Sequence, residues 1–333
     1  MNTTHPLRRR VLGLAAVAGF AALSATALPA AAEPKRIAIA NFGEHPQLNA
    51  VAAGFKKALA DAGFAEGKDV VYSLSHTNFD ASLVPQMIAK LQAEKPVLML
   101  TITTPVSQIA KKALATSGIP IIFAAVTDPV AAKLVPSWTA GDTGMSGASD
   151  LQDVAAVVSF SRQLLPNMKG FGLPYNPGEA NDVALVEKAR AAVQAAGLTL
   201  ATVGVDSAND IPQRIASLKG KADMVYNPAS NLLQPAVAAV AAGARTIGIP
   251  VINSDESAVE KGIVLASFAV NYTQVGMNAG RIAAQILKGT DPKTIPVAVP
   301  TLKDHAPKIS RKGLEAFKLK LPPALADCKC LVD

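Results

Sequence analysis

The stretch from Ile119 to Val135, IPIIFAAVTDPVAAKLV, constrains the fold more than any other part of the chain. It begins as a short apolar run rich in β-branched residues, which is too short for a typical helix and suits a strand buried on both faces of a parallel sheet. The run stops at Thr127-Asp128-Pro129, where the proline prevents the strand from continuing. Because ligands of open α/β sheets bind just outside the carboxyl ends of the strands, we expect Asp128 to meet a polar group of a ligand.

Strand-like and helix-like segments alternate on both sides of this stretch. Further strands are expected at 35–40, 70–74, 97–101, 170–173, 198–205, 223–226, 250–253 and 262–268, and helices at 48–62, 83–92, 106–116, 152–165, 180–196, 211–218, 232–242 and 275–287. A polar, glycine-rich segment from Ser137 to Gly147 interrupts the rhythm, and the same cycle then starts again. The pattern predicts an α/β fold with two doubly wound parallel-sheet lobes.

The elements that follow the second lobe are too few to form a third one. We therefore expect them to return to the first lobe and to cross again. Lobe 1 is expected to comprise residues 33–148 plus about 270–294, and lobe 2 residues 149–262 plus about 300–333, with hinge crossings near 144–149, 263–270 and 295–300. Two lobes joined by several crossings describe a hinged clamp that holds a ligand between its strand ends.

The N-terminal 32 residues have the pattern of a cleaved secretory signal peptide. Arg8-Arg9-Arg10 precede an apolar run from Val11 to Leu28, and the small residues Ala30-Ala31-Ala32 follow as a cleavage site. An uncleaved membrane anchor is the alternative, although Gly, Ala and Pro29 weaken the run. The arginines also resemble a twin-arginine signal. We expect export to the periplasm.

Charge and cysteine content exclude several kinds of partner. The whole chain carries a formal charge of +7, which falls to +4 once the three arginines of residues 1–32 are removed. No Lys/Arg cluster with interleaved aromatic residues is present, so we expect no nucleic-acid binding. In an extended chain Cys328 and Cys330 would point to opposite sides, so that a bond between them would be strained, and their redox state stays open. No cysteine stands directly after the predicted cleavage site, where it could carry a lipid.

The candidate ligand-binding residues lie at or near the ends of the predicted strands. They are Phe42, Glu44, Thr103, Thr104, Asp128, Tyr175, Asn176, Glu179, Asn181, Tyr226, Asn227, Asn231 and Asp255. Aromatic rings in a cleft supply apolar area and stacking for a flat ligand. The two threonines precede a helix, and helix N-termini favour anions such as a carboxylate.

Each candidate also has a structural interpretation. Asp128 could cap the segment that follows it, and Asn176 and Asn227, each followed by proline, could bond their own turns. We expect Tyr272 to be structural, because it lies at the start of a crossing helix. No nucleophile elbow, dinucleotide fingerprint or phosphate loop occurs, and the histidines of the mature chain lack metal-ligand spacing. We therefore expect no catalytic residue, metal or cofactor.

Several motifs occur together in an order typical of one known family. They are His45-Pro46-Gln47-Leu48, Gly54-Phe55, Thr104-Pro105-Val106-Ser107-Gln108, Pro120 to Pro129 ending in Val-Thr-Asp-Pro, Tyr175 to Asn181, and Ile286-Leu287-Lys288-Gly289. In these motifs the chain resembles substrate-binding proteins of bacterial ABC transporters, specifically the branch whose characterised members bind tryptophan and related aromatic amino acids. The resemblance implies a type I periplasmic-binding-protein fold with a three-strand hinge.

The same resemblance implies a monomer that performs no chemistry. It would capture an amino acid with an aromatic or large apolar side chain and deliver it to an ABC permease in the inner membrane. Two acids usual in the family are neutral here, at Asn49 and in the turn that starts at Asn227, and Asp182 stands where the family usually has serine. Because an amino group needs acceptors, a different aromatic or other small solute stays open as the ligand. A sensor subunit that docks on a membrane receptor is the other alternative.

Overall fold

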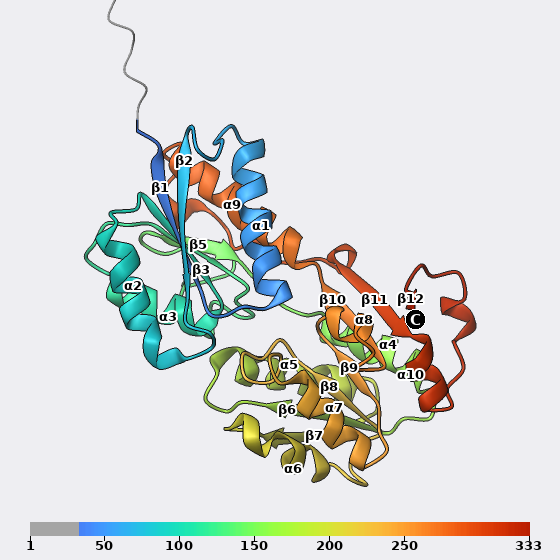
Figure 1. The fold of residues 1–333 in the computed structure, drawn as a ribbon. Coiled ribbons are helices and arrows are strands. Elements are labelled where there is room, and N and C mark those ends of the chain that lie inside the picture. The colour runs from blue at the N-terminus through green and yellow to red at the C-terminus, as the bar shows by residue number, and fades with distance from the viewer. Residues whose placement is uncertain (1–32) are drawn as a thin grey trace, which may run out of the picture. The chain divides into compact units, whose positions relative to one another are not determined.

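The alternating strands and helices form two separate β-sheets in the computed structural model (Figure 1). The structure describes residues 33–333, and the predicted signal peptide, with its twin-arginine pattern, lies outside the described residues. Pro34–Asp333 forms one compact unit. Both sheets are mainly parallel and are flanked by helices, which confirms the predicted α/β fold class.

The first sheet is entirely parallel, with the strand order β2-β1-β3-β4-β5. Its strands are β1 (Lys35–Asn41), β2 (Val70–His76), β3 (Leu98–Ile102), β4 (Ile121–Ala124) and β5 (Met145–Ala148). The helices that belong with it are α1 (Pro46–Asp61), α2 (Val84–Ala93), α3 (Thr104–Ala113) and α9 (Tyr272–Leu287). Every residue of β4 is buried, as predicted for the apolar run that ends before Thr127.

The second sheet has the order β12-β11-β10-β9-β8-β6-β7. Its strands are β6 (Gly170–Tyr175), β7 (Thr199–Gly204), β8 (Met224–Asn227), β9 (Val251–Asn253), β10 (Ala266–Val270), β11 (His305–Ser310) and β12 (Leu331–Val332). Its helices are α4 (Val154–Leu164), α5 (Ala180–Ala195), α6 (Ile211–Ala216), α7 (Val237–Thr246), α8 (Ser257–Glu260) and α10 (Arg311–Ala316). Short 3₁₀ turns lie at Ala81–Leu83, Ala208–Asp210, Pro292–Thr294, Leu302–Asp304 and Pro323–Leu325.

The chain passes between the two sheets more than once. It leaves the first sheet after β5 and returns at Asn271, the residue that caps α9, which packs along α1 (Figure 1). The segment before β11 then runs beside the end of β5, where Ala148 and Ala298 form a parallel bridge. β11 is antiparallel to β10 because it enters the sheet at the carboxyl end of β10, with His305 opposite Val270.

One local prediction needs correction, and one open question is answered. The helix expected from Leu232 begins only at Val237, since Pro235 disfavours the helical conformation of the residue before it. Cys328 and Cys330, whose redox state the sequence left open, form a disulfide with their Cα atoms 5.1 Å apart. Their side chains would point to opposite sides in an extended chain, whereas the tail turns at these residues. Among residues 33–333 no helix is long and apolar enough to cross a membrane.

Helices α1 and α9 approach each other closely because glycines lie at their contact. A Cβ atom on Gly276 would overlap the carbonyl oxygen of Val51, and one on Gly54 would overlap the carbonyl oxygen of Thr273. The close contact joins a helix from the start of the chain to one that follows β10, so it fastens the returning segment onto the first sheet.

We predict that Gly276→Ala lowers the free energy of unfolding by about 1–3 kcal/mol, because the added methyl forces the two backbones apart. Urea denaturation followed by circular dichroism measures the effect. Gly204→Ala is the matched control, since its added methyl would approach only Pro177, no nearer than 3.8 Å. Equal stability of the two variants would contradict the close packing described here.

Candidate functional site

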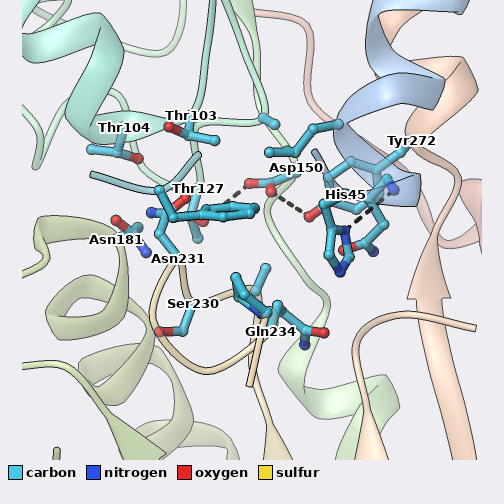
Figure 2. A pocket seen from close by; sticks show the side chains of 16 residues that line it. His45, Thr103, Thr104, Thr127, Asp150, Asn181, Ser230, Asn231, Gln234 and Tyr272 are labelled. Atoms are coloured by element: carbon cyan, nitrogen blue, oxygen red, sulfur yellow. Dashed lines mark hydrogen bonds between the residues drawn. The ribbon is translucent and has the colours of Figure 1, made fainter. Parts of the chain in front are cut away.

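The carboxyl ends of strands from both sheets surround one cavity (Figure 2). The space between these strand ends, with its open mouth included, is about 400 Å³. The residues that line it are His45, Gln47, Leu48, Phe79, Thr103, Thr104, Ala125, Thr127, Asp150, Asn181, Ala229, Ser230, Asn231, Gln234, Pro235 and Tyr272. Most of them lie in loops that follow strands, where parallel sheets bind ligands.

Thr103 and Thr104 place the N-terminus of α3 against the cavity. Thr103 has a φ of 86°, and its buried Oγ1 has no hydrogen-bond partner among the described residues. The first turn of α3 contains no acidic side chain, and the amide N–H groups of a first helical turn have no partner within the helix. Free N–H groups and the helix dipole together favour an anion at this point.

Asp150 is a buried carboxyl group on the cavity wall, in the loop after β5. It accepts hydrogen bonds from the Tyr272 hydroxyl at 2.6 Å and from the Thr127 hydroxyl at 3.0 Å. Burial raises the pKa of Asp150, and the two hydroxyl groups oppose that change. No basic side chain among residues 33–333 contributes to its pKa. The cavity therefore contains a carboxyl group without a cationic partner from the described chain.

Phe79 supplies the aromatic surface of the cavity. Its backbone is in the left-handed region, with a φ of 67°, and its ring packs edge-on against Phe42, with ring centroids 5.6 Å apart. Phe42 itself is buried behind that ring and does not line the cavity. Leu48 and Pro235 add apolar surface.

A group of amide and carboxyl side chains forms the wall contributed by the second sheet. Glu179 accepts hydrogen bonds from the side-chain amides of Asn176, Asn181 and Asn231, at 3.1, 3.1 and 2.7 Å. Asp182 accepts from the backbone N–H of Asn176 at 2.7 Å and from Nδ2 of Asn181 at 2.8 Å. Burial, and next the neighbouring Glu179, raise the pKa of Asp182 well above its usual range.

The structure brings four of the predicted residues to the cavity wall and leaves the others outside it. Thr103, Thr104, Asn181 and Asn231 line the cavity. The residues that do not line it are Phe42, Glu44, Asp128, Tyr175, Asn176, Glu179, Tyr226, Asn227 and Asp255. Of these, Asn176 and Glu179 stand behind the wall in the amide network, whereas Tyr226 and Asn227 are buried within β8.

The acids expected to meet an amino group have other partners. Oδ1 of Asp128 accepts the N–H groups of Val130 and Ala131, at 3.1 and 3.0 Å, so the turn interpretation holds for this residue. Its Oδ2 lies 3.3 Å from Nζ of Lys188, on α5 of the other lobe. Glu44 is exposed and lies 3.5 Å from His76.

Two further contacts connect the start of α1 with the loop after β9 beside the cavity. Nε2 of Gln47 donates to the carbonyl oxygen of Ser254 at 3.0 Å, and His45 lies 3.7 Å from Asp255. Burial lowers the pKa of His45, and Asp255 partly opposes that change. Together with the pair of Lys188 and Asp128, these contacts fasten the two cavity walls to each other.

Sequence reasoning missed most of the lining residues, including Phe79, Asp150 and Tyr272. Asp150 follows the segment that was interpreted as a crossing, and Phe79 lies in a loop after β2 that showed no motif. Tyr272 was expected to be structural, but it lines the cavity and also holds Asp150. One signal was available, because Asp150 is an acid that directly follows the end of β5.

A family model described as ABC transporter substrate binding protein matches residues 36–319. The chain belongs to this family. A tyrosine-binding protein of Clostridioides difficile is 32% identical to this substrate-binding protein over 286 residues, which are 86% of this chain and 81% of the relative. The resemblance noted from the sequence motifs is thereby confirmed at the level of the family.

Solved structures of similar proteins agree with this assignment. A domain from Streptococcus pneumoniae in complex with L-Trp has a TM-score of 0.83 and 28% identity, over 90% of this chain and 100% of that one. The ligand-free, open form of a substrate-binding protein with adhesive properties from Clostridium difficile has a TM-score of 0.70 and 32% identity, over 90% of this chain and 99% of that one.

We predict that Tyr272→Phe lowers the free energy of unfolding by about 1–3 kcal/mol near neutral pH, because it removes a donor from a buried carboxyl group. In the wild-type protein the hydrogen bond from Tyr272 lowers the pKa of Asp150. Its removal therefore raises that pKa further. The cost therefore grows as the pH rises through the pKa of Asp150, and it shrinks at about pH 3, below the ordinary aspartate value of 3.8, where a carboxyl group of raised pKa is protonated.

Chemical denaturation at both pH values measures this difference. Tyr226→Phe is the matched control, because the hydroxyl group of Tyr226 is also buried and has no hydrogen-bond partner among the described residues. A loss of stability that is the same for both variants would contradict the role given to Tyr272.

Proposed function

We propose that this substrate-binding protein captures an amino acid with an aromatic side chain in the cavity described above. The observation that carries the proposal is the buried carboxyl group of Asp150, which has no cationic partner in the described chain, on a cavity that also contains the N-terminus of α3. A carboxyl group that can bind a cation and a helix N-terminus that can bind an anion, both on one cavity, suit a zwitterion. The names of the relatives, with tyrosine and L-Trp, support an aromatic ligand.

The α-carboxylate would lie at Thr103 and Thr104. The hydroxyl group of Thr103 is buried without a partner among residues 33–333, so a bound carboxylate would satisfy it. The free N–H groups of the first turn of α3 would bind the same group, as helix N-termini bind anions.

The α-ammonium would lie at Asp150. Burial raises the pKa of Asp150 because its ionised form loses contact with solvent. A neighbouring positive charge stabilises the ionised form and lowers the pKa again. Asp150 thereby meets the need for an acceptor that the neutral Asn49 and Asn227 had left open. The aromatic ring would pack on Phe79, with Leu48 and Pro235 around it.

Capture would proceed by closure of the two lobes about the crossings. We retain the boundaries derived from the sequence, with lobe 1 over 33–148 plus about 270–294 and lobe 2 over 149–262 plus about 300–333. The contacts of Gln47 with Ser254 and of Lys188 with Asp128 support a closed arrangement. The higher TM-score to the L-Trp complex than to the open, ligand-free structure supports it as well.

The remaining steps follow from the family. The protein would be exported to the periplasm, act as a monomer and deliver its ligand to an ABC permease in the inner membrane, without chemistry of its own. The signal-peptide pattern of residues 1–32 supports export.

A thermal-shift panel tests the proposal. The mature chain from Glu33 is unfolded and refolded to remove carried-over ligand, and Phe, Tyr, Trp and Leu are compared with 3-phenylpropionate and phenethylamine. A ligand at about 100 times its Kd adds roughly 2.7 kcal/mol, and we expect that shift only with aromatic amino acids. A shift with 3-phenylpropionate as large as the largest shift among the aromatic amino acids would overturn the role of the ammonium group.

Asp150→Asn is predicted to weaken amino-acid binding by at least about 30-fold, since one partner of a buried charge pair is lost. Calorimetry measures the Kd, and Asp61→Asn, on the exposed part of α1, is the control. An unchanged Kd in Asp150→Asn would exclude this carboxyl group from the site.

The pH dependence of binding has a definite sign. A bound ammonium group stabilises ionised Asp150, so binding releases a proton wherever the free protein still holds one. Affinity should therefore rise with pH up to the raised pKa of Asp150 in the free protein, and then become constant. Asp150→Asn should remove this rise. An affinity that falls over the same range would contradict the assignment.

A further inference from the structure

The side-chain amide of Asn181 has an orientation that its neighbours determine. Its Nδ2 donates to Glu179 at 3.1 Å and to Asp182 at 2.8 Å. Rotation of the amide by half a turn would place its oxygen against the carboxylate oxygen of Glu179, which also accepts from Asn231 and offers no donor. The oxygen must therefore point away from the two acids. Asn181 is 3% exposed, and its Oδ1 has no hydrogen-bond partner among residues 33–333.

Asn231 is held by the same carboxylate from a different loop. Its Nδ2 donates to Glu179 at 2.7 Å, and its backbone N–H donates to the same oxygen at 3.1 Å. With its NH₂ group turned towards Glu179, the oxygen of this amide is also directed away from the acid. Both asparagines line the cavity, and Figure 2 shows them on the wall below Thr103 and Thr104.

Among the described residues, the side-chain hydrogen bonds of Glu179 are confined to three asparagines. All its hydrogen-bond partners are N–H groups of Asn176, Asn181 and Asn231. It forms no ion pair within residues 33–333, and it does not cap α5 with its side chain although it is the N-cap residue. Because Glu179 accepts from the NH₂ groups of Asn181 and Asn231, the oxygens of these two amides point away from Glu179.

We propose that Glu179 is a positioning residue that turns the amide oxygens of Asn181 and Asn231 into the cavity, so that this wall selects a ligand side chain carrying an O–H or N–H donor. The inference rests on the proposed function, in which the two ends of the amino-acid head group already have their partners at Thr103 and Asp150. The donor would then come from the side chain, as a phenol hydroxyl or an indole N–H supplies it.

The selectivity follows from the buried oxygen of Asn181. A ligand with a donor at the end of its ring satisfies it, whereas phenylalanine covers it with C–H groups and leaves it without a partner. Sites built to bond a substrate hydroxyl reject the analogue that lacks it by up to about 10⁴–10⁵-fold. For a cavity that keeps some polar surface, we expect tyrosine to bind at least about 100-fold more tightly than phenylalanine.

The test is the ratio of dissociation constants for Tyr and Phe, with 4-aminophenylalanine as a second donor, measured by calorimetry on the refolded mature protein. Asn181→Leu removes the acceptor, and Glu179→Gln offers an oxygen and an NH₂ group, so that one asparagine can turn around. Both variants should lower the preference for Tyr over Phe by about tenfold or more. Glu187→Gln, the same change at an exposed position of α5, should leave the ratio unaltered.

The ratio separates positioning from a structural role, because a general loosening of the wall weakens both ligands alike. Circular dichroism of each variant establishes that it is folded, and Asn181→Leu provides the test if Glu179→Gln does not fold. Equal binding of Tyr and Phe by the wild-type protein would overturn this inference and leave the proposed function standing. Failure of every aromatic amino acid to bind would overturn both.

Discussion

The buried carboxyl group of Asp150 is the point on which the site depends. It follows β5, where the chain leaves the first sheet, and its hydrogen bonds come from Thr127 after β4 and from Tyr272 at the start of the returning helix α9. Asp150 therefore connects the crossing after β5 with the loop after β4 and with the start of α9. Such a group is costly to bury without a positive partner, and that cost makes the cavity suited to a ligand that brings one.

Backbone strain is concentrated at the same cavity. Thr103, Ala125 and Phe79 line it, and all three have positive φ angles, of 86°, 54° and 67°. Non-glycine residues in this region cost free energy and persist only where the surrounding structure holds them. Here buried strands precede Thr103 and Ala125, and the ring of Phe79 is packed on Phe42. A threonine and an aromatic ring at these strained positions line one cavity.

The pattern of strands and helices was predictable to a large extent. Alternating apolar runs and helical periodicity determine an α/β fold, and buried strands such as β4 can be recognised from composition alone. The rule that ligands meet the ends of parallel strands correctly led to the loops, and Thr103 and Thr104 follow from it. The rule does not predict the role of Asp128, because an acid at a strand end can bind a ligand or stabilise a turn. In the structure Asp128 accepts two backbone N–H groups of its own turn.

The sequence by itself determined the fold class, the family and the loops in which the site lies, because these depend on local periodicity and on motifs in a set order. Only the tertiary structure decided which side chains in those loops face the cavity. Asp150 and Tyr272 are 122 residues apart, and Glu179 reaches Asn231 across 52 residues. Contacts over such separations depend on how distant strands and helices pack, within a lobe for Glu179 and Asn231 and across the crossings for Asp150 and Tyr272, and no local pattern records them.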